Sequence, residues 1–120
     1  MKKIEAFEKA IENKVPNLRE VGINPTLFWA YRNLEETEND KIDFNEVIWD
    51  EDIEAIAETL DANGITEFTI SCNFSGLIRT LVAFEKVGFK MAGTTQVNAN
   101  YTDIRTGKYA QVDALRMQKA

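Results

Sequence analysis

Residues 65–93, which read ITEFTISCNFSGLIRTLVAFEKVGFKMAG, decide the fold, because they predict a strand, a short turn, a helix and a second strand. In the first eight residues of this stretch, apolar and polar side chains alternate. The apolar set is Phe68, Ile70 and Cys72, and the polar set is Glu67, Thr69 and Ser71. A repeat of two residues is typical of a strand with one buried face, so we expect the polar face to meet solvent or a partner.

We expect the helix of this stretch to be among the most buried in the protein, because its apolar stripe is broad. The stripe is formed by Leu77, Ile78, Leu81, Val82, Phe84 and Val87. Asn73 or Ser75 is expected to cap the start of the helix, and Gly88 is expected to end it. Alternation resumes from Phe89, which predicts the second strand.

Two helices are predicted upstream of this stretch. Apolar residues recur at helical spacing over residues 4–15, and Pro16 ends the first helix near residue 14. Asn24 is expected to cap a second helix that begins at Pro25. The polar residues 35–40, EETEND, then predict a loop.

The rest of the chain predicts further strands and one more helix. Residues 42–47 predict a short strand, residues 51–63 an amphipathic helix and residues 103–108 a hairpin turn. Residues 109–117 predict a last strand whose irregular alternation indicates a bulge or an edge position. We therefore expect one α+β domain over residues 1–120. In this fold two N-terminal helices precede a β-α-β-α-β-β order, and a mixed four-stranded sheet carries its helices mainly on one face.

The amino-acid inventory excludes much of catalytic and cofactor chemistry. The 120 residues contain no histidine and one cysteine, so triads that use imidazole and zinc sites that use histidine or several thiolates are ruled out. No glycine-rich phosphate-binding loop occurs. We therefore expect a protein that is not an enzyme and that has no cofactor.

Charge and hydropathy limit the partners and the location. The formal net charge of −6 disfavours direct binding to nucleic acid, whose affinity depends on neutralising phosphates. No run of about 18 apolar residues occurs, so no membrane span is expected. The N-terminus lacks the apolar core of a signal peptide, and the single Cys72 fits a reducing compartment. A cytoplasmic location is the prediction that follows.

The middle of the chain carries the strongest functional signal. Between Glu35 and Asp61 there are twelve carboxylates and one base, Lys41. Four of the carboxylates recur at helical spacing in the predicted helix, and they are Glu51, Glu54, Glu58 and Asp61. Two interpretations are open. The row is either the solvated face of an amphipathic helix or a surface that docks on a protein partner with a basic surface, as an inhibitor or a nucleic-acid mimic does. The second interpretation underlies our functional prediction.

Trp29 and Trp49 are candidate interface anchors, because aromatic residues are enriched among the residues that dominate binding energy. Packing into the core is the alternative role for both, and a homodimer is also left open.

Two weaker site candidates accompany this surface. Free helix amides at Asn73, Ser75 and Gly76 are suited to an anionic cofactor, with simple helix capping as the alternative. Oxygen ligands for a divalent cation occur at Glu38, Asp40, Asp43 and Asn45, with a solvated loop as the alternative. No metal is expected.

The blocks FTISCNFSGLIRTLVAFEKVGFKMAG, NPTLFWAYRN and IDFNEVIWD resemble a family of short uncharacterised proteins, a domain of unknown function, from gut Gram-positive bacteria and their mobile elements. The resemblance covers nearly the whole chain. It implies a cytosolic accessory role in the conflict or transfer functions of such an element.

The segment that runs from Asn73 to FEKVGF at residues 84–89 also resembles the C-terminal half of the GNAT acyltransferase superfamily, in which an aromatic-x-x-x-Gly-Phe motif precedes a strand. The predicted order of elements from residue 42 onward matches that half. The pyrophosphate loop of the superfamily has no counterpart between Val47 and Ile53, and Phe84 stands where a tyrosine often serves as general acid. The resemblance implies shared topology. A degenerate acyltransferase or small-ligand-binding domain is the alternative to a protein-binding function.

Overall fold

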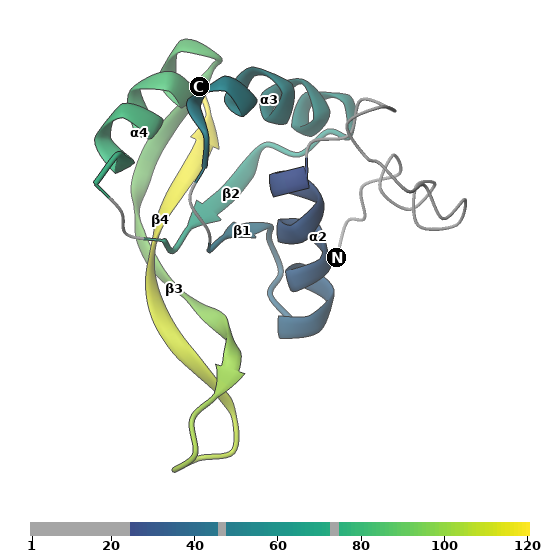
Figure 1. Ribbon diagram of the computed structural model, residues 1–120, viewed down its shortest axis with the longest axis vertical. Coiled ribbons are helices and arrows are strands. Elements are labelled where there is room, and N and C mark those ends of the chain that lie inside the picture. Colours follow the sequence, from purple (N-terminus) through teal and green to yellow (C-terminus); the bar gives the residue numbers. More distant parts are fainter. Residues whose placement is uncertain (1–24, 46–47, 73–74) are drawn as a thin grey trace.

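The computed structural model describes residues 25–45, 48–72 and 75–120. The expected helix that ends near residue 14 lies outside these ranges, as do Asn24 and Val47. The described elements are α2 (Pro25–Thr37), β1 (Asp43–Phe44), the 3-10 turn η2 (Asp50–Asp52), α3 (Ile53–Ala62), β2 (Glu67–Ile70), α4 (Leu77–Lys86), β3 (Phe89–Thr102) and β4 (Tyr109–Lys119), as Figure 1 shows.

The strands form a mixed four-stranded sheet in the order β1-β2-β4-β3. β1 runs parallel to β2, and β4 is antiparallel to both β2 and β3. The predicted fold class, α+β with a mixed sheet, is confirmed. Of the described part of the predicted strand over residues 42–47, only Asp43 and Phe44 align with β2, and residues 46–47 lie outside the described ranges.

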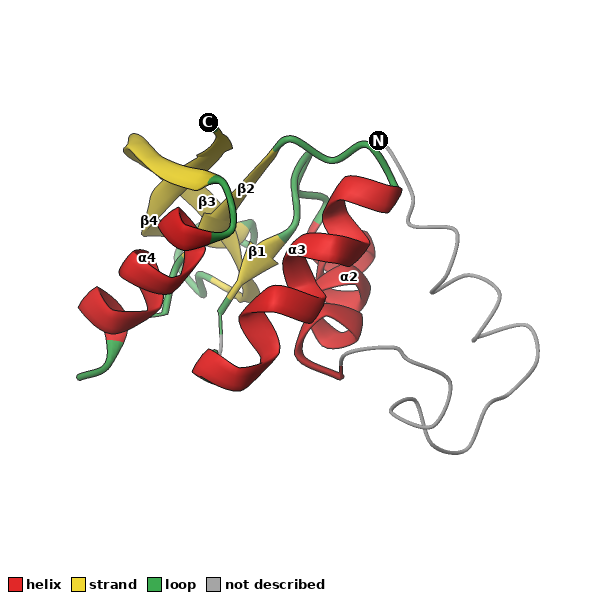
Figure 2. Ribbon diagram, turned by 90° about the horizontal axis from the view of Figure 1, so that it is seen from above, coloured by secondary structure: helices red, strands yellow, loops and turns green. Residues whose placement is uncertain are grey.

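The core lies between one face of this sheet and the helices. Phe68 of β2 is at its centre, with its ring centroid 5.0 Å from Phe84 of α4, 5.2 Å from Phe89 of β3 and 5.4 Å from Phe44 of β1. Buried residues of α2 and α3 join the same cluster. Figure 2 shows α3 and α4 beside each other on one side of the strands. The placement of helices mainly on one face therefore follows the prediction.

The polar side of β2 differs from the prediction. Thr69 was expected on a solvated or partner-covered face, yet it is buried. Its neighbour across the β1–β2 pair is Asp43, whose carboxylate accepts hydrogen bonds from the Thr69 and Ser71 hydroxyls at 2.6 Å each. These polar groups can be buried because they form hydrogen bonds with each other. The alternation of polar and apolar residues in the sequence does not reveal such a partner.

The burial expected for α4 is wrong. Within the helix only Thr80 and Phe84 are buried, whereas Ile78 is 78% exposed and Val82 is 46% exposed. A helix that covers a sheet buries one side of its surface, so an apolar stripe wider than that side must emerge into solvent.

Two helix boundaries also differ. α2 continues to Thr37, through half of the predicted loop EETEND, and the Thr37 hydroxyl donates to the Asn33 carbonyl oxygen at 2.6 Å. α4 is capped by Gly76 without a side-chain hydrogen bond, so the expected cap by Ser75 is wrong, and Asn73 lies outside the described residues. The predicted end at Gly88 is confirmed by its positive φ angle of 96°, and Gly64 follows α3 with a φ angle of 68°.

The β3–β4 hairpin is a long twisted arm that turns at residues 103–108, as predicted (Figure 1). The irregularity expected in the last strand lies instead in its partner. β4 is an interior strand, and both register shifts consist of extra residues in β3, between Met91 and Gly93 and between Asn98 and Thr102. The second shift leaves residues 99–101 opposite a single residue of β4.

Candidate functional site

The four predicted carboxylates form one exposed row along η2 and α3, which we call the acidic row: Glu51, Glu54, Glu58 and Asp61. The opposite side of α3 is anchored in the core by Ile53, Ile56, Ala57 and Leu60, all of them buried. The spacing of three, four and three residues places the row on one side of the helix. The structure therefore brings the predicted carboxylates together on a rigid support.

The members of the row differ in their ionic partners. Asp61 pairs with Lys119 of β4, whose ammonium lies 2.6 Å from the carboxylate. Asp50, just before the row, lies 3.4 Å from the Arg79 guanidinium. No basic side chain of the described ranges forms an ion pair with Glu51, Glu54 or Glu58. The negative charge of these three residues therefore has no direct ionic partner within the described part of the chain.

Trp49 stands at the start of the row and is 61% exposed. It borders a hollow of about 280 Å³ between η2 and α4, to which Glu51, Gly76, Arg79 and Thr80 also contribute. An indole, a carboxylate and a hollow thus meet at one end of the acidic row. The prediction of Trp49 as an interface anchor stays a prediction, but the alternative role in the core is wrong.

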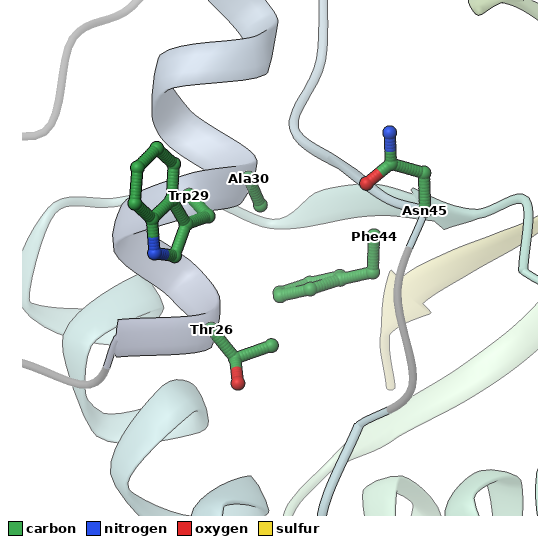
Figure 3. Close-up of a pocket in the computed structure, with 5 residues that line it drawn as sticks. All are labelled: Thr26, Trp29, Ala30, Phe44 and Asn45. Atoms are coloured by element: carbon green, nitrogen blue, oxygen red, sulfur yellow. The ribbon is translucent and has the colours of Figure 1, made fainter. Parts of the chain in front are cut away.

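Trp29 lies on a different element and is not joined to the row. Its side chain, 51% exposed, contacts Phe28 edge to face and lies 5.5 Å from the Arg32 guanidinium carbon. Trp29, Thr26 and Ala30 of α2 line a crevice with Phe44 and Asn45, and Figure 3 shows Thr26 and Ala30 toward Phe44 and the Trp29 indole on the side of the helix away from it. The crevice has no room for a water molecule, so it is a packing seam of α2 against β1.

The weaker anion site stays a prediction. Ser75 is exposed, and Gly76 lines the hollow beside Asp50 and Glu51. Arg79 lines the same hollow and pairs with Asp50, so charges of both signs lie next to the start of α4. The metal alternative lacks its ligand cluster, since no group of three or more Asp, Glu or Cys side chains in the described part of the chain could hold an ion.

A second hollow was not predicted. We call it the strand-end hollow, and it is lined by Asn45, Ser71, Ala99, Asn100, Tyr101 and Val112. Its volume is about 270 Å³. It lies where the parallel strands β1 and β2 end and the hairpin arm passes beside them.

Asp43 lies next to this hollow through its hydrogen bond with Ser71. Burial raises the pKa of the Asp43 carboxyl above its ordinary value of 3.8, and the hydrogen bonds from Ser71 and Thr69 oppose that rise. A buried carboxylate with a perturbed pKa beside a hollow is a common feature of functional sites. The one sequence signal for it is an aspartate placed between two apolar residues, Ile42 and Phe44.

The fold and the surface define a class: an α+β domain with a mixed sheet, one aromatic core and an acidic helix on its outside. The family described as "Domain of unknown function (DUF7698)" matches residues 26–119, so the chain belongs to this family. Comparison with the curated proteins and with the solved structures gave no match. Within the described ranges, every helix is too short or too polar to cross a bilayer.

Proposed function

We propose that the protein acts by binding another protein that has a basic surface, and that the acidic row and Trp49 form the contact. The observation that carries this proposal is the set of three exposed carboxylates, Glu51, Glu54 and Glu58, on a helix whose other side is held by the core. None of the three forms an ion pair within the described ranges.

The energetics of the helix favour this interpretation over a merely solvated face. Carboxylates three or four residues apart repel each other and destabilise a helix by about 0.2–0.5 kcal/mol per pair. The helix dipole compensates Glu51 and Glu54 near the first turn, but it does not compensate Glu58. A basic partner would relieve the repulsion that remains and would be attracted over a distance by the same field.

Trp49 supplies the apolar part of the contact. Surface tryptophans are enriched among the residues that contribute most to binding energy, and a hollow beside the ring gives a partner side chain a place to insert. A basic side chain placed there would meet the indole face and the Glu51 carboxylate together.

In its finer form, the proposal is that the partner is a nucleic-acid-binding protein and that the acidic row imitates phosphates. The row covers ten helical steps, or about 15 Å at 1.5 Å per residue, which is comparable to a few phosphates along one strand of a duplex. The protein would then be a cytoplasmic accessory or inhibitor encoded by a mobile element, in line with the resemblance of its sequence blocks.

A charge-reversal capture experiment tests the proposal. The row variant Glu51→Lys, Glu54→Lys, Glu58→Lys is compared with a matched control, Glu36→Lys, Glu85→Lys, Asp113→Lys, which changes the net charge equally at exposed residues of other elements. Each protein is immobilised and exposed to purified nucleic-acid-binding proteins and to extract of the encoding cells, with and without competing duplex DNA.

The wild type and the control variant are expected to retain the same basic proteins, and the row variant is expected to lose them by tenfold or more. Competing DNA is expected to displace the partner in the finer form of the proposal. Equal capture by the row variant would eliminate this surface as the contact.

A second candidate function, small-ligand binding on a degenerate acyltransferase-like fold, is favoured by the strand-end hollow beside Asp43. The acyl-transfer form requires a pyrophosphate near the start of α3, where Asp50, Glu51 and Asp52 would repel it. Calorimetric titration with acetyl-CoA separates the two candidates, because micromolar binding would favour the enzyme and no heat is expected for a protein-binding domain.

A further inference from the structure

The strand-end hollow has the features of a built site. Parallel strands β1 and β2 end beside it, and crevices at the carboxyl ends of parallel strands are common places for ligands. The register shift in β3 leaves residues 99–101 without a regular partner in β4, and all three line the hollow. Bulges often re-aim side chains toward a site, and this one directs Asn100 and Tyr101 out of the regular ladder.

Asp43 gives the hollow its charge. The residue is 7% exposed, and its two carboxylate oxygens accept hydrogen bonds from the Thr69 and Ser71 hydroxyls. Both donors are neutral, so they stabilise the carboxylate without cancelling its charge. None of the residues that the structure places around the hollow is basic. The Asp43 carboxylate, which lies behind Ser71, therefore gives the hollow a negative potential.

The hollow offers several hydrogen-bond acceptors, and Asn45, whose Oδ1 accepts from Asn33, adds an amide donor. Since the Ser71 hydroxyl donates its proton to Asp43, the Ser71 oxygen is left with acceptor capacity toward the hollow. The side chains of Asn100 and Tyr101 also contain acceptor oxygens. Ala99 and Val112 complete the wall with apolar surface. A ligand that fits this lining has a positively charged donor at one end and a short apolar body at the other.

We propose that the strand-end hollow binds a small organic cation, whose ammonium group donates a hydrogen bond to the Ser71 oxygen and lies in the field of Asp43. The volume of about 270 Å³ matches a small organic molecule. This site is separate from the acidic row in its residues and its elements, so it does not depend on the protein-binding function.

The test is an NMR titration of the full chain with three probes of similar size: n-butylammonium chloride, 1-butanol and sodium butyrate. The ammonium is expected to cause saturable shifts in the amides of Ser71, residues 99–101 and Val112, with an affinity at least tenfold above that of butanol. Butyrate is expected not to saturate. Equal affinity for ammonium and butyrate, or ammonium shifts confined to α3, would overturn the proposal.

Point variants test whether ammonium binding depends on the charge of Asp43 or on the shape of the hollow. Asp43→Asn keeps the size and much of the hydrogen bonding, and it is expected to reduce ammonium affinity by tenfold or more. Its matched control is Asp113→Asn, an exposed carboxylate paired with Gln96 and one residue from Val112, which is expected to stay within twofold. Unchanged affinity in Asp43→Asn would refute the role of the charge.

Two further variants decide the matter if Asp43→Asn does not fold. Ser71→Ala keeps the carboxylate and removes the acceptor oxygen, so it is expected to weaken ammonium binding by at least fivefold. Val112→Trp fills the half-buried wall of the hollow and is expected to abolish binding of all probes. Binding that survives both substitutions would place the cation elsewhere. The Glu51→Lys, Glu54→Lys, Glu58→Lys variant is expected to bind ammonium as the wild type does, which keeps this result distinct from the outcome of protein capture.

Discussion

At the scale of single residues, Phe68 lies at the centre of the aromatic core. Its ring meets those of Phe44, Phe84 and Phe89, so one side chain joins three strands to α4. The same cluster explains why residue 84 is a phenylalanine and not a tyrosine. The Phe84 ring is fully buried, and a hydroxyl on it would need a hydrogen-bond partner inside the aromatic cluster.

Phe68→Ala is expected to lower the free energy of unfolding by about 3–5 kcal/mol, because it leaves a cavity at the meeting point of four rings. The matched control is Ile78→Ala, on the exposed side of α4, which is expected to change stability by no more than about 0.5 kcal/mol. Urea unfolding curves of the two variants measure the difference. Similar losses for both would mean that the outer side of α4 is covered in solution.

Asp43 makes stability depend on pH in a defined direction. Its pKa is raised in the folded state, so between 3.8 and that raised pKa the folded chain binds more protons than the unfolded chain at this group. The contribution of Asp43 to stability is therefore full below pH 3.8 and is lost as pH rises through the raised pKa.

The stability of wild type relative to Asp43→Asn is consequently expected to fall as pH increases from about 4 toward neutral. Urea unfolding of both proteins across this pH range measures the difference in their free energies of unfolding. Subtracting one free energy from the other removes the titration of all other groups. A difference that stays flat or rises with pH would show that burial does not dominate at Asp43.

The sequence predicts the elements better than it predicts their surroundings. The strand at β2, the glycine that ends α4 and the turn at residues 103–108 depend on local geometry, and all three are confirmed. The burial of Thr69 and the exposure of Ile78 depend on which strand or helix lies opposite, and no periodicity contains that information. The acidic row could be predicted because it lies within one helix. The strand-end hollow could not, because β1, β2 and the hairpin arm meet there from distant parts of the sequence.

At the scale of elements, Asn39 attaches the hairpin arm to the end of α2. Its amide nitrogen donates to the Asn98 carbonyl oxygen, and its amide oxygen accepts from the Asn98 backbone nitrogen, both at 2.9 Å. The Asn98 side chain also donates to the Thr37 carbonyl oxygen at 2.9 Å. An asparagine side chain thus replaces a neighbouring strand at this point of β3, which protects part of an edge that would otherwise be open.

Asn39→Ala is expected to speed hydrogen exchange of the Asn98 amide by tenfold or more and to cost about 1–3 kcal/mol, since three side-chain hydrogen bonds disappear, two to Asn98 and one to Thr37. Asn100→Ala, an exposed residue of the same strand, is the control and is expected to leave that amide protected. Hydrogen exchange followed by NMR measures the exchange rate of the Asn98 amide in both variants. An unchanged Asn98 rate in Asn39→Ala would show that the arm is held by other contacts.

At the scale of the whole molecule, charge is unevenly distributed. The chain carries −6 in total, while the segment after Glu85 is basic, with six Lys or Arg residues against Asp103 and Asp113. The negative excess is therefore concentrated upstream, where the acidic row projects from α3. This asymmetry gives the molecule an orienting field, and association through the row is expected to slow several-fold when ionic strength rises from about 50 to 300 mM.

Mapping the contact on the intact protein tests the protein-binding account most directly. The wild type, labelled with ¹⁵N, is titrated with the basic protein that it captures, and the perturbed signals are assigned to residues. The account predicts that the largest changes fall on the amides of residues 50–61 and on the Trp49 indole N–H, and that raised ionic strength reverses them. Changes that fall instead on the outer side of α4 around Ile78 and Val82, with residues 50–61 unaffected, would contradict it.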